Sequence, residues 1–334
     1  MTKHPITSRP AVGRLLTAGV CLLVMLGITA CGSTTSTTSA SSSAGATSAI
    51  TIKIGTLQTD DILPLWAAVQ DGSAKAAGLD LQIQTFMSAQ DEVTAVTAKQ
   101  VDAIMTDMVV PVQLTASGTA MRSVTRLQGS PAGIVAAPGA GIAQVSDLAG
   151  VAAGCSSPTA MEYIYDKALS DAGVKPDQIK TQEIKNLSVR LQMVTGGQIK
   201  AAVLPWTLFA MAQKQGAVPL LDSTQASNYS STVLAFRAEW LSSNAQANDA
   251  ITKLLALQNA EVAKINANPD SYRSLLAQQA KLPAPLATSY KVRTYPTAGL
   301  PDQKQFESVV AWMVSKGYIK APIPYSDLVW SPTA

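Results

Sequence analysis

The sequence predicts an α/β fold with parallel sheets, built as two lobes of like topology and followed by a helical tail. Short segments that alternate apolar and polar residues are separated by segments with helical spacing, and this order is typical of parallel sheets. The pattern runs from about residue 51 to 127 and again from about 151 to 204. Beyond residue 237, apolar residues recur at helical spacing without further strands.

In the first lobe, strands and helices alternate along the chain. Thr59, Asp60 and Asp61 offer N-cap oxygens for the first helix, which Gly72 interrupts, and Ser88 opens the second helix with a capping-box pattern. The predicted strands cover 51–57, 79–86, 102–105 and 121–127. The predicted helices cover 62–78, 88–98 and 108–116.

The second lobe repeats this plan. Ser156 and Ser157 are expected to cap its first helix, with Pro158 at the first helical position. The predicted strands cover 151–154, 179–184 and 201–204, and the helices 157–173 and 187–195. The sequence at 99–104 resembles that at 197–202, each at the start of the third strand of its lobe. We therefore expect two lobes in tandem.

The N-terminus has the plan of a secretory signal, with a basic leader and then an apolar run over 15–30. The run ends at Ala30-Cys31 and resembles a bacterial lipobox, which implies a signal peptide over 1–30 and a lipid on Cys31. An ordinary signal with a chance cysteine is the alternative. The Ser/Thr-rich linker over 31–49 suits a flexible tether. We expect a lipid-anchored protein on the extracytoplasmic face of a membrane.

Composition excludes several classes of function. Residues 1–30 hold three basic residues and no acidic one, so the remaining chain carries 22 of each charge and gives no nucleic-acid footprint. The single histidine, His4, and Cys21 both lie in the leader, and only Cys155 follows Cys31. Without histidine, neither a Ser-His-Asp triad nor a Cys/His metal cluster can form. An enzyme that works through carboxylates is not excluded.

Six short motifs, in order, carry a resemblance to a known family. They are Ala77-Gly78-Leu79 after Gly72, Gln100-Val101-Asp102-Ala103, Asp147-Leu148-Ala149-Gly150, Gly196-Gly197-Gln198, Asn268-Pro269-Asp270 and Gly317-Tyr318-Ile319. Over about residues 52–329 the chain resembles solute-binding proteins of ABC importers in the nitrate, taurine, sulfonate and thiamine-precursor group.

The resemblance implies a two-lobed, type II periplasmic-binding-protein-like fold, with a helical C-terminal tail. Residues 50–133 with 234–334 would form the first lobe and residues 134–233 the second, with hinge strands near 133–137 and 233–237. It implies a monomer without cofactor or metal. The partners implied are a small-molecule ligand, an ABC permease and its ATPase, and the membrane through the lipid anchor, with no nucleic acid.

Ligands of open α/β sheets bind beyond the carboxyl ends of the strands, where helix N-termini also point. Helix capping is the alternative role for each hydroxyl there, and a core position is the alternative for Trp66. The expected ligand-binding residues are Gln58, Thr59, Asp60, Trp66, Ser88, Gln90, Thr106, Asp107, Ser156, Ser157, Thr159 and Trp206.

The ligand class is suggested by one departure from the family. Many relatives have Leu-Pro-Glu-Pro at the strand end where this chain has Leu204-Pro205-Trp206-Thr207, so an indole replaces a carboxylate. Asp60, Asp61, Asp91 and Asp107 remain as acidic candidates, and an anion would depend on helix N-termini and Arg190. We favour a neutral or zwitterionic, ring-containing ligand such as a pyrimidine precursor; a sulfonate remains open.

Two other functions compete with import. A surface sensor on the same fold would have the same sequence features. A related fungal enzyme that makes the thiamine pyrimidine uses a histidine and a cysteine-rich segment, and the chain after residue 30 has neither. We therefore expect a binding protein and not an enzyme.

Overall fold

A computed structural model describes residues 49–129 and 132–332 of the protein. The predicted signal peptide, Cys31 and the linker up to residue 48 lie outside the described residues. Within the described part of the chain, no helix has both the length and the apolar composition that a membrane span requires.

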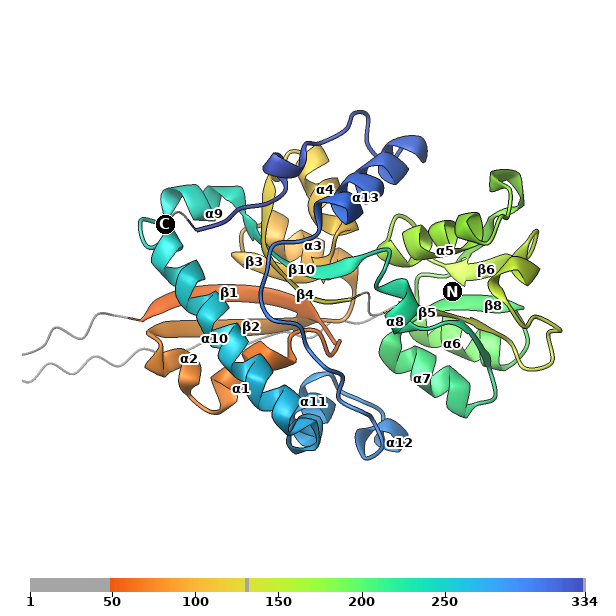
Figure 1. Ribbon diagram of the computed structural model, residues 1–334, viewed down its shortest axis with the longest axis horizontal. Helices are drawn as coiled ribbons and strands as arrows, with labels where there is room; N and C mark the ends of the chain where they lie inside the picture. The colour runs from red at the N-terminus through yellow and green to blue at the C-terminus, as the bar shows by residue number, and fades with distance from the viewer. Residues whose placement is uncertain (1–48, 130–131, 333–334) are drawn as a thin grey trace, which may run out of the picture. The chain divides into compact units, whose positions relative to one another are not determined.

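The first sheet has five strands (Figure 1). Four of them precede the second sheet along the chain and one follows it. Its spatial order is β2-β1-β3-β10-β4, in which β1 is parallel to β2 and β3, while β10 is antiparallel to β3 and β4. The strands are β1 (Ile50–Leu57), β2 (Leu79–Phe86), β3 (Ala103–Asp107), β4 (Met121–Gly129) and β10 (Ser231–Arg237).

The second sheet has the same plan, with the order β7-β6-β8-β5-β9 and with β5 antiparallel to β8 and β9. Its strands are β5 (Ala132–Ala136), β6 (Ala152–Cys155), β7 (Lys180–Glu183), β8 (Ala201–Pro205) and β9 (Val218–Leu221). The predicted tandem α/β fold is therefore confirmed. Each sheet also contains one reversed strand, and β5 and β10 coincide with the predicted hinge strands.

The burial of each strand agrees with the polarity of its residues. Strands β5 and β10 are buried almost throughout, and their near-continuous apolar runs are typical of strands covered on both faces. The edge strand β7, in contrast, is exposed at every position and carries polar residues. The short strand β9, which we did not predict, shows no apolar–polar alternation because it is four residues long and contains Val, Pro and two Leu.

Helices cover both sheets (Figure 1). The helices over 89–97, 109–116 and 187–195 agree with the predicted ranges to within one residue, whereas the helix over 206–214 was not predicted. Gly72 and Gly78 take positive φ values of 80° and 79° at the two ends of α2, a conformation that glycine adopts without steric cost. The helices flanking the first sheet are α1 (Leu63–Gln70), α2 (Ser73–Ala76), α3 (Ala89–Thr97) and α4 (Val109–Ala116). Those of the second are α5 (Ala160–Asp171), α6 (Leu187–Thr195), α7 (Trp206–Lys214) and α8 (Ser223–Ala226).

The tail is helical, as expected, and returns to the first lobe. Helix α10 packs on α1, and α13 packs on α4. The buried face of α13 contains Phe306, Val309, Val310 and Met313, the stripe that the sequence predicts. The tail helices are α9 (Ala238–Ser243), α10 (Ala247–Ala267), α11 (Arg273–Gln279), α12 (Ala284–Ala287) and α13 (Gln303–Ser315).

Two predicted helix caps are wrong. Helix α1 has Ile62 at its N-cap and no side-chain cap, because Asp60 faces other partners. Helix α5 is capped by Thr159, whose hydroxyl accepts a hydrogen bond from the Glu162 amide at 3.3 Å, and not by Ser156 or Ser157. The predicted cap of α3 is confirmed, since Ser88 Oγ accepts from the Asp91 amide at 3.1 Å.

Candidate ligand-binding site

The carboxyl ends of three parallel strands bring several predicted residues to one edge of the first sheet. The β1–β2 register pairs Leu57 with Phe86, so the chain leaves both strands at the same level. Just beyond this edge, Gln58 Nε2 lies 2.8 Å from the sulfur of Met87. The neighbouring strand β3 ends at Asp107 on the other side of β1. This edge is the first wall of the candidate site.

Asp60 is held by three residues of the tail that sequence reasoning missed. Its carboxylate accepts from Arg293 Nε at 2.8 Å and Nη2 at 2.9 Å, and from the Tyr290 hydroxyl at 2.7 Å. The Tyr295 hydroxyl donates to the Asp60 carbonyl at 2.6 Å. More than 200 residues separate these partners, so no local pattern could identify them. The bidentate ion pair occupies the Asp60 carboxylate, which is 1% exposed.

Arg293 also links the first-lobe edge to the second lobe. Its guanidinium carbon lies 5.8 Å from the ring centroid of Trp206, within the range of a cation–π interaction. Trp206 begins α7 directly after strand β8 and stacks on Phe209, with ring centroids 5.1 Å apart. The expected residues Asp60 and Trp206 therefore lie on one chain of contacts that joins the lobes.

Asp61 is buried beside this ion pair. Its carboxylate lies 3.7 Å from Arg293 Nη2 and accepts from the Thr232 hydroxyl at 3.4 Å. Burial, together with the negative charge of Asp60, raises its pKa to about 7, and Arg293 only partly opposes this shift. Thr232 is also the cross-strand partner of Asp107, so the two acidic side chains flank the same residue of β10.

Asp107 connects the first-lobe edge with helix α5 of the second lobe. Its carboxylate accepts from the amides of Val109 at 2.7 Å and Val110 at 3.3 Å, at the start of α4. The amide of Ala160, the first residue of α5, is near enough to lower the pKa of Asp107. Burial raises the pKa of Asp107, and these backbone donors lower it in part. Asp107, which we predicted as a site residue because it ends strand β3, therefore lies next to helix α5 of the second lobe.

Glu92 is a further residue that sequence reasoning missed. It is fully buried on α3, and neither carboxylate oxygen has a hydrogen-bond partner among the described residues. Burial, followed by the charge of Asp107, raises its pKa well above the usual value, while the nearby Thr106 hydroxyl lowers it. The sequence did carry a signal: Glu92 shares the helix face of Ala95 and Val96, which are buried.

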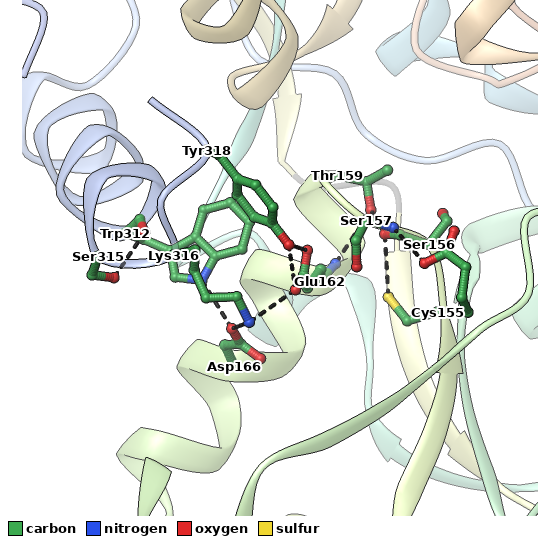
Figure 2. A network of polar contacts seen from close by, with 11 residues as sticks. Cys155, Ser156, Ser157, Thr159, Glu162, Asp166, Trp312, Ser315, Lys316 and Tyr318 are labelled. Carbon is green, nitrogen blue, oxygen red and sulfur yellow. Dashed lines mark hydrogen bonds and ion pairs between the residues drawn. The ribbon is translucent and has the colours of Figure 1, made fainter. Parts of the chain in front are cut away.

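The second-lobe residues from Ser156 to Thr159 mostly bond within their own loop (Figure 2). The Thr159 hydroxyl donates to the Ser156 carbonyl at 2.7 Å and caps α5. The Ser157 amide donates to Glu183 at 3.1 Å. These bonds order the turn that presents the α5 N-terminus to Asp107, so the loop positions a wall of the candidate site.

Helix α5 is also bound by the C-terminal tail, through a set of five residues that we call the tail cluster: Glu162, Asp166, Trp312, Lys316 and Tyr318 (Figure 2). Lys316 Nζ lies 2.9 Å from both acidic side chains, and the Trp312 indole donates to Asp166 at 2.9 Å. The Tyr318 hydroxyl lies within 2.9 Å of both Glu162 carboxylate oxygens. The tail thus fixes the helix whose N-terminus faces Asp107.

Other candidates have different surroundings. Trp66 is 4% exposed in the first-lobe core, the alternative weighed for it. Ser88 and Gln90 are exposed at the start of α3, where Ser88 acts as a cap. Arg190 is fully buried and donates to the carbonyls of Ile184 and Val203 at 2.9 Å. The suggestion that Arg190 serves an anionic ligand is therefore wrong, because its donors satisfy backbone acceptors of the second-lobe core.

Comparisons with known proteins agree with this architecture. The structure is similar to the periplasmic aliphatic sulphonate binding protein SsuA from Escherichia coli, with a TM-score of 0.72 and 18% identity over 85% of this chain and 92% of that one. It is also similar to the alkanesulfonate-binding protein SsuA from Xanthomonas axonopodis pv. citri bound to MOPS, with a TM-score of 0.69 and 13% identity over 84% and 98%.

The desulfurization enzyme DSZB has the same fold, with a TM-score of 0.63 and 13% identity over 84% of this chain and 96% of that one. No curated protein matches the sequence. The family model described as NMT1/THI5 like matches residues 59–271, which is more than half of the chain. This protein therefore belongs to the NMT1/THI5-like family.

Proposed function

We propose that the protein is the extracytoplasmic solute-binding component of an ABC importer. It captures a small polar organic ligand between its lobes and delivers it to a permease and its ATPase. The family match and the fold shared with proteins named as periplasmic binding proteins support this role. The single observation that carries it is the convergence of Asp60, Arg293 and Trp206, which brings both lobes to one place.

In this proposal the first lobe comprises residues 50–133 with 234–334, and the second lobe comprises residues 134–233. They rotate about the segments that connect the sheets, near β5 and β10. Cys31 carries the lipid that holds the protein at the outer face of the membrane, next to its permease. Binding rather than catalysis is the proposed activity, although DSZB demonstrates that this fold also supports an enzyme.

The proposed ligand is neutral or zwitterionic and contains a flat ring. Trp206 supports this choice, because a partly exposed indole beside Arg293 offers a face on which a ring can stack. The engaged guanidinium is a further argument against a purely anionic ligand, since Asp60 already occupies two of its donors.

The test is a thermal-unfolding screen of the full chain with pyrimidines, flavins, amino acids, sulfonates, MOPS and nitrate. A bound ligand at one hundred times its Kd is expected to stabilise the protein by about 2.7 kcal/mol. Intrinsic fluorescence of Trp206 is expected to change with the same ligand. Turnover of a compound would contradict the proposed non-enzymatic role, and stabilisation by nitrate without stabilisation by any ring compound would contradict the proposed ligand class.

A further inference from the structure

The tail cluster joins the two lobes, because its acidic members lie on α5 and its other members belong to the tail (Figure 2). Helix α5 packs on β5 and β8, so it belongs to the second lobe. Helix α13 packs on α4, and the bridge between Ser123 and Val329 ties the chain after α13 to strand β4 of the first sheet. Each contact in the tail cluster therefore runs from one lobe to the other.

These contacts are made by side chains that reach across from one helix to the other. Lys316 Nζ lies 2.9 Å from a carboxylate oxygen of Glu162 and 2.9 Å from one of Asp166. Beside them, the Tyr163 hydroxyl of α5 lies 2.8 Å from Ser308 Oγ of α13. Hydrogen bonds are lost once donor and acceptor separate beyond about 3.5 Å. The contacts therefore hold α5 and α13 in one relative position.

The tail cluster lies away from the segment that leads from the second sheet into β10. At the start of α13, Gln305 Oε1 accepts from Ser231 Oγ at 2.8 Å, and Gln305 Nε2 donates to the Ser227 carbonyl at 3.0 Å. Lys316 lies about 16 Å further along the helix axis. A rotation of about 15° about an axis that crosses the start of α13 would move atoms at Lys316 by about 4 Å. Rotation of the lobes therefore breaks the contacts of the tail cluster.

The arrangement that the tail cluster holds is one in which the lobes touch at their strand ends. Arg293, which binds Asp60 after β1, has its guanidinium carbon 5.8 Å from the ring centroid of Trp206 after β8. On the same helix as Trp206, Lys214 Nζ donates to the Ser289 hydroxyl of the tail. These contacts involve α7, whereas the tail cluster involves α5. The second lobe is thus held against the first at two places.

We propose that the tail cluster is a latch, which holds the two lobes closed and is released when they rotate apart. The proposal rests on the proposed solute-binding function, because that function requires the lobes to rotate. The strength of the latch sets the fraction of the protein that is closed before a ligand binds. A ligand of the closed form binds with an apparent Kd equal to its intrinsic Kd divided by that fraction. A weaker latch therefore weakens binding without changing any contact to the ligand.

The experiment measures the distance between the lobes in the absence of ligand. Spin labels at Thr97→Cys on α3 and Gln192→Cys on α6, two exposed positions, report this distance by double electron–electron resonance. The full chain is used, with Cys21→Ser, Cys31→Ser and Cys155→Ala. Helices α3 and α6 follow β2 and β7, which end each sheet on the side away from the strands where the chain crosses between lobes. The distance between the labels is therefore sensitive to rotation.

The latch is weakened in two independent ways. Lys316→Met removes both ion pairs, whereas Trp312→Phe combined with Tyr318→Phe removes two hydrogen-bond donors and keeps the aromatic rings. Lys253→Met is the matched control, because it breaks an exposed ion pair with Asp249 within α10 of the first lobe. Either latch variant is expected to raise the ratio of a longer to a shorter distance by about fivefold to a hundredfold. The control is expected to leave this ratio unchanged.

The wild type is expected to populate mainly the shorter distance. The same distance distribution in the wild type and both latch variants would overturn the proposal, as would a wild type that populates only the longer distance or an equal response to Lys253→Met. If Lys316→Met does not fold, as circular dichroism would show, the variant with both aromatic changes decides alone. No ligand enters the measurement, so each of these outcomes leaves the proposed solute-binding function intact.

Discussion

At the scale of single residues, burial sets the protonation of Asp61. Its pKa of about 7 in the folded state lies above the ordinary value of 3.8, so the folded protein binds a proton more tightly than the unfolded chain. The resulting stabilisation is fully present below about pH 4 and is lost as the pH rises through about 7. Glu92 shifts in the same direction and adds to this trend.

Asp61→Asn is therefore expected to flatten the pH dependence of stability between pH 4 and 7 and to make the protein more stable than the wild type at pH 8. Urea unfolding at pH 5, 6, 7 and 8 measures the effect as a change in the free energy of unfolding. Glu307→Gln serves as the control, with an unchanged slope. An Asp61→Asn variant that keeps the wild-type slope would show that another group titrates in this range.

Arg190 has a structural role in the second-lobe core that its position in the sequence does not reveal. The arginine follows the cap of α6, where a ligand contact is plausible from sequence alone. In the structure its guanidinium donates to backbone carbonyls beside Gly154, and a Cβ at Gly154 would lie 3.2 Å from the Arg190 Cγ. The glycine leaves room for a buried arginine stem, so both residues belong to the core of the second lobe.

At the scale of elements, helix α5 is held at two places. Its N-terminal amide lies near Asp107 of the first lobe and lowers the pKa of that carboxyl, and its next two turns carry the acidic residues of the tail cluster. Glu162 is 2% exposed, whereas the Lys316 side chain is 34% exposed, so the ion pair is only partly screened by water. The tail cluster therefore contributes to the position of α5 and, through it, to the wall of the candidate site.

A double-mutant cycle with Glu162→Gln and Lys316→Met is expected to give a coupling energy of about 1 to 3 kcal/mol, because the Glu162 carboxylate is buried and water screens its attraction to Lys316 only in part. The exposed pair Lys167–Asp171 on the same helix, at 2.6 Å, is the matched control and is expected to couple by no more than about 0.5 kcal/mol. Chemical denaturation of the four variants of each cycle provides the measurement. Equal coupling in the two pairs would mean that burial adds nothing to the tail cluster.

At the scale of the whole molecule, the proposed lipid on Cys31 decides where the binding lobes work. Cys31→Ser is expected to move the protein from the detergent phase to the aqueous phase in a detergent-partition assay, because the acyl chains supply the apolar surface that retains it. Cys155→Ala is the control, since this thiol is buried and its pKa is raised to about 12. Continued retention of the Cys31→Ser protein in the detergent phase would argue for another anchor.

Much of the fold follows from patterns that are local in sequence. The apolar alternation of β1 and β2, the Ser88 cap and the stripe on α13 involve residues within a few positions of one another, so they can be recognised without the tertiary structure. The repeat that placed β3 and β8 at equivalent positions predicted two lobes of like topology, and the two sheets do share one plan of strand order. The pairing of β10 beside β3, in contrast, depends on a long return of the chain.

The candidate site was predicted only in part, for the same physical reason. Sequence alone placed Asp60, Asp107 and Trp206 at strand ends, because the geometry of parallel sheets assigns those ends to one edge. Only the tertiary structure decided that Arg293 and Tyr290 hold Asp60, and that Glu92 is buried with no hydrogen-bond partner for its carboxylate among residues 49–129 and 132–332. Charge pairing and desolvation depend on which distant segments meet in space. The sequence therefore determined a two-lobed α/β fold, and tertiary packing determined the charge that its candidate site presents.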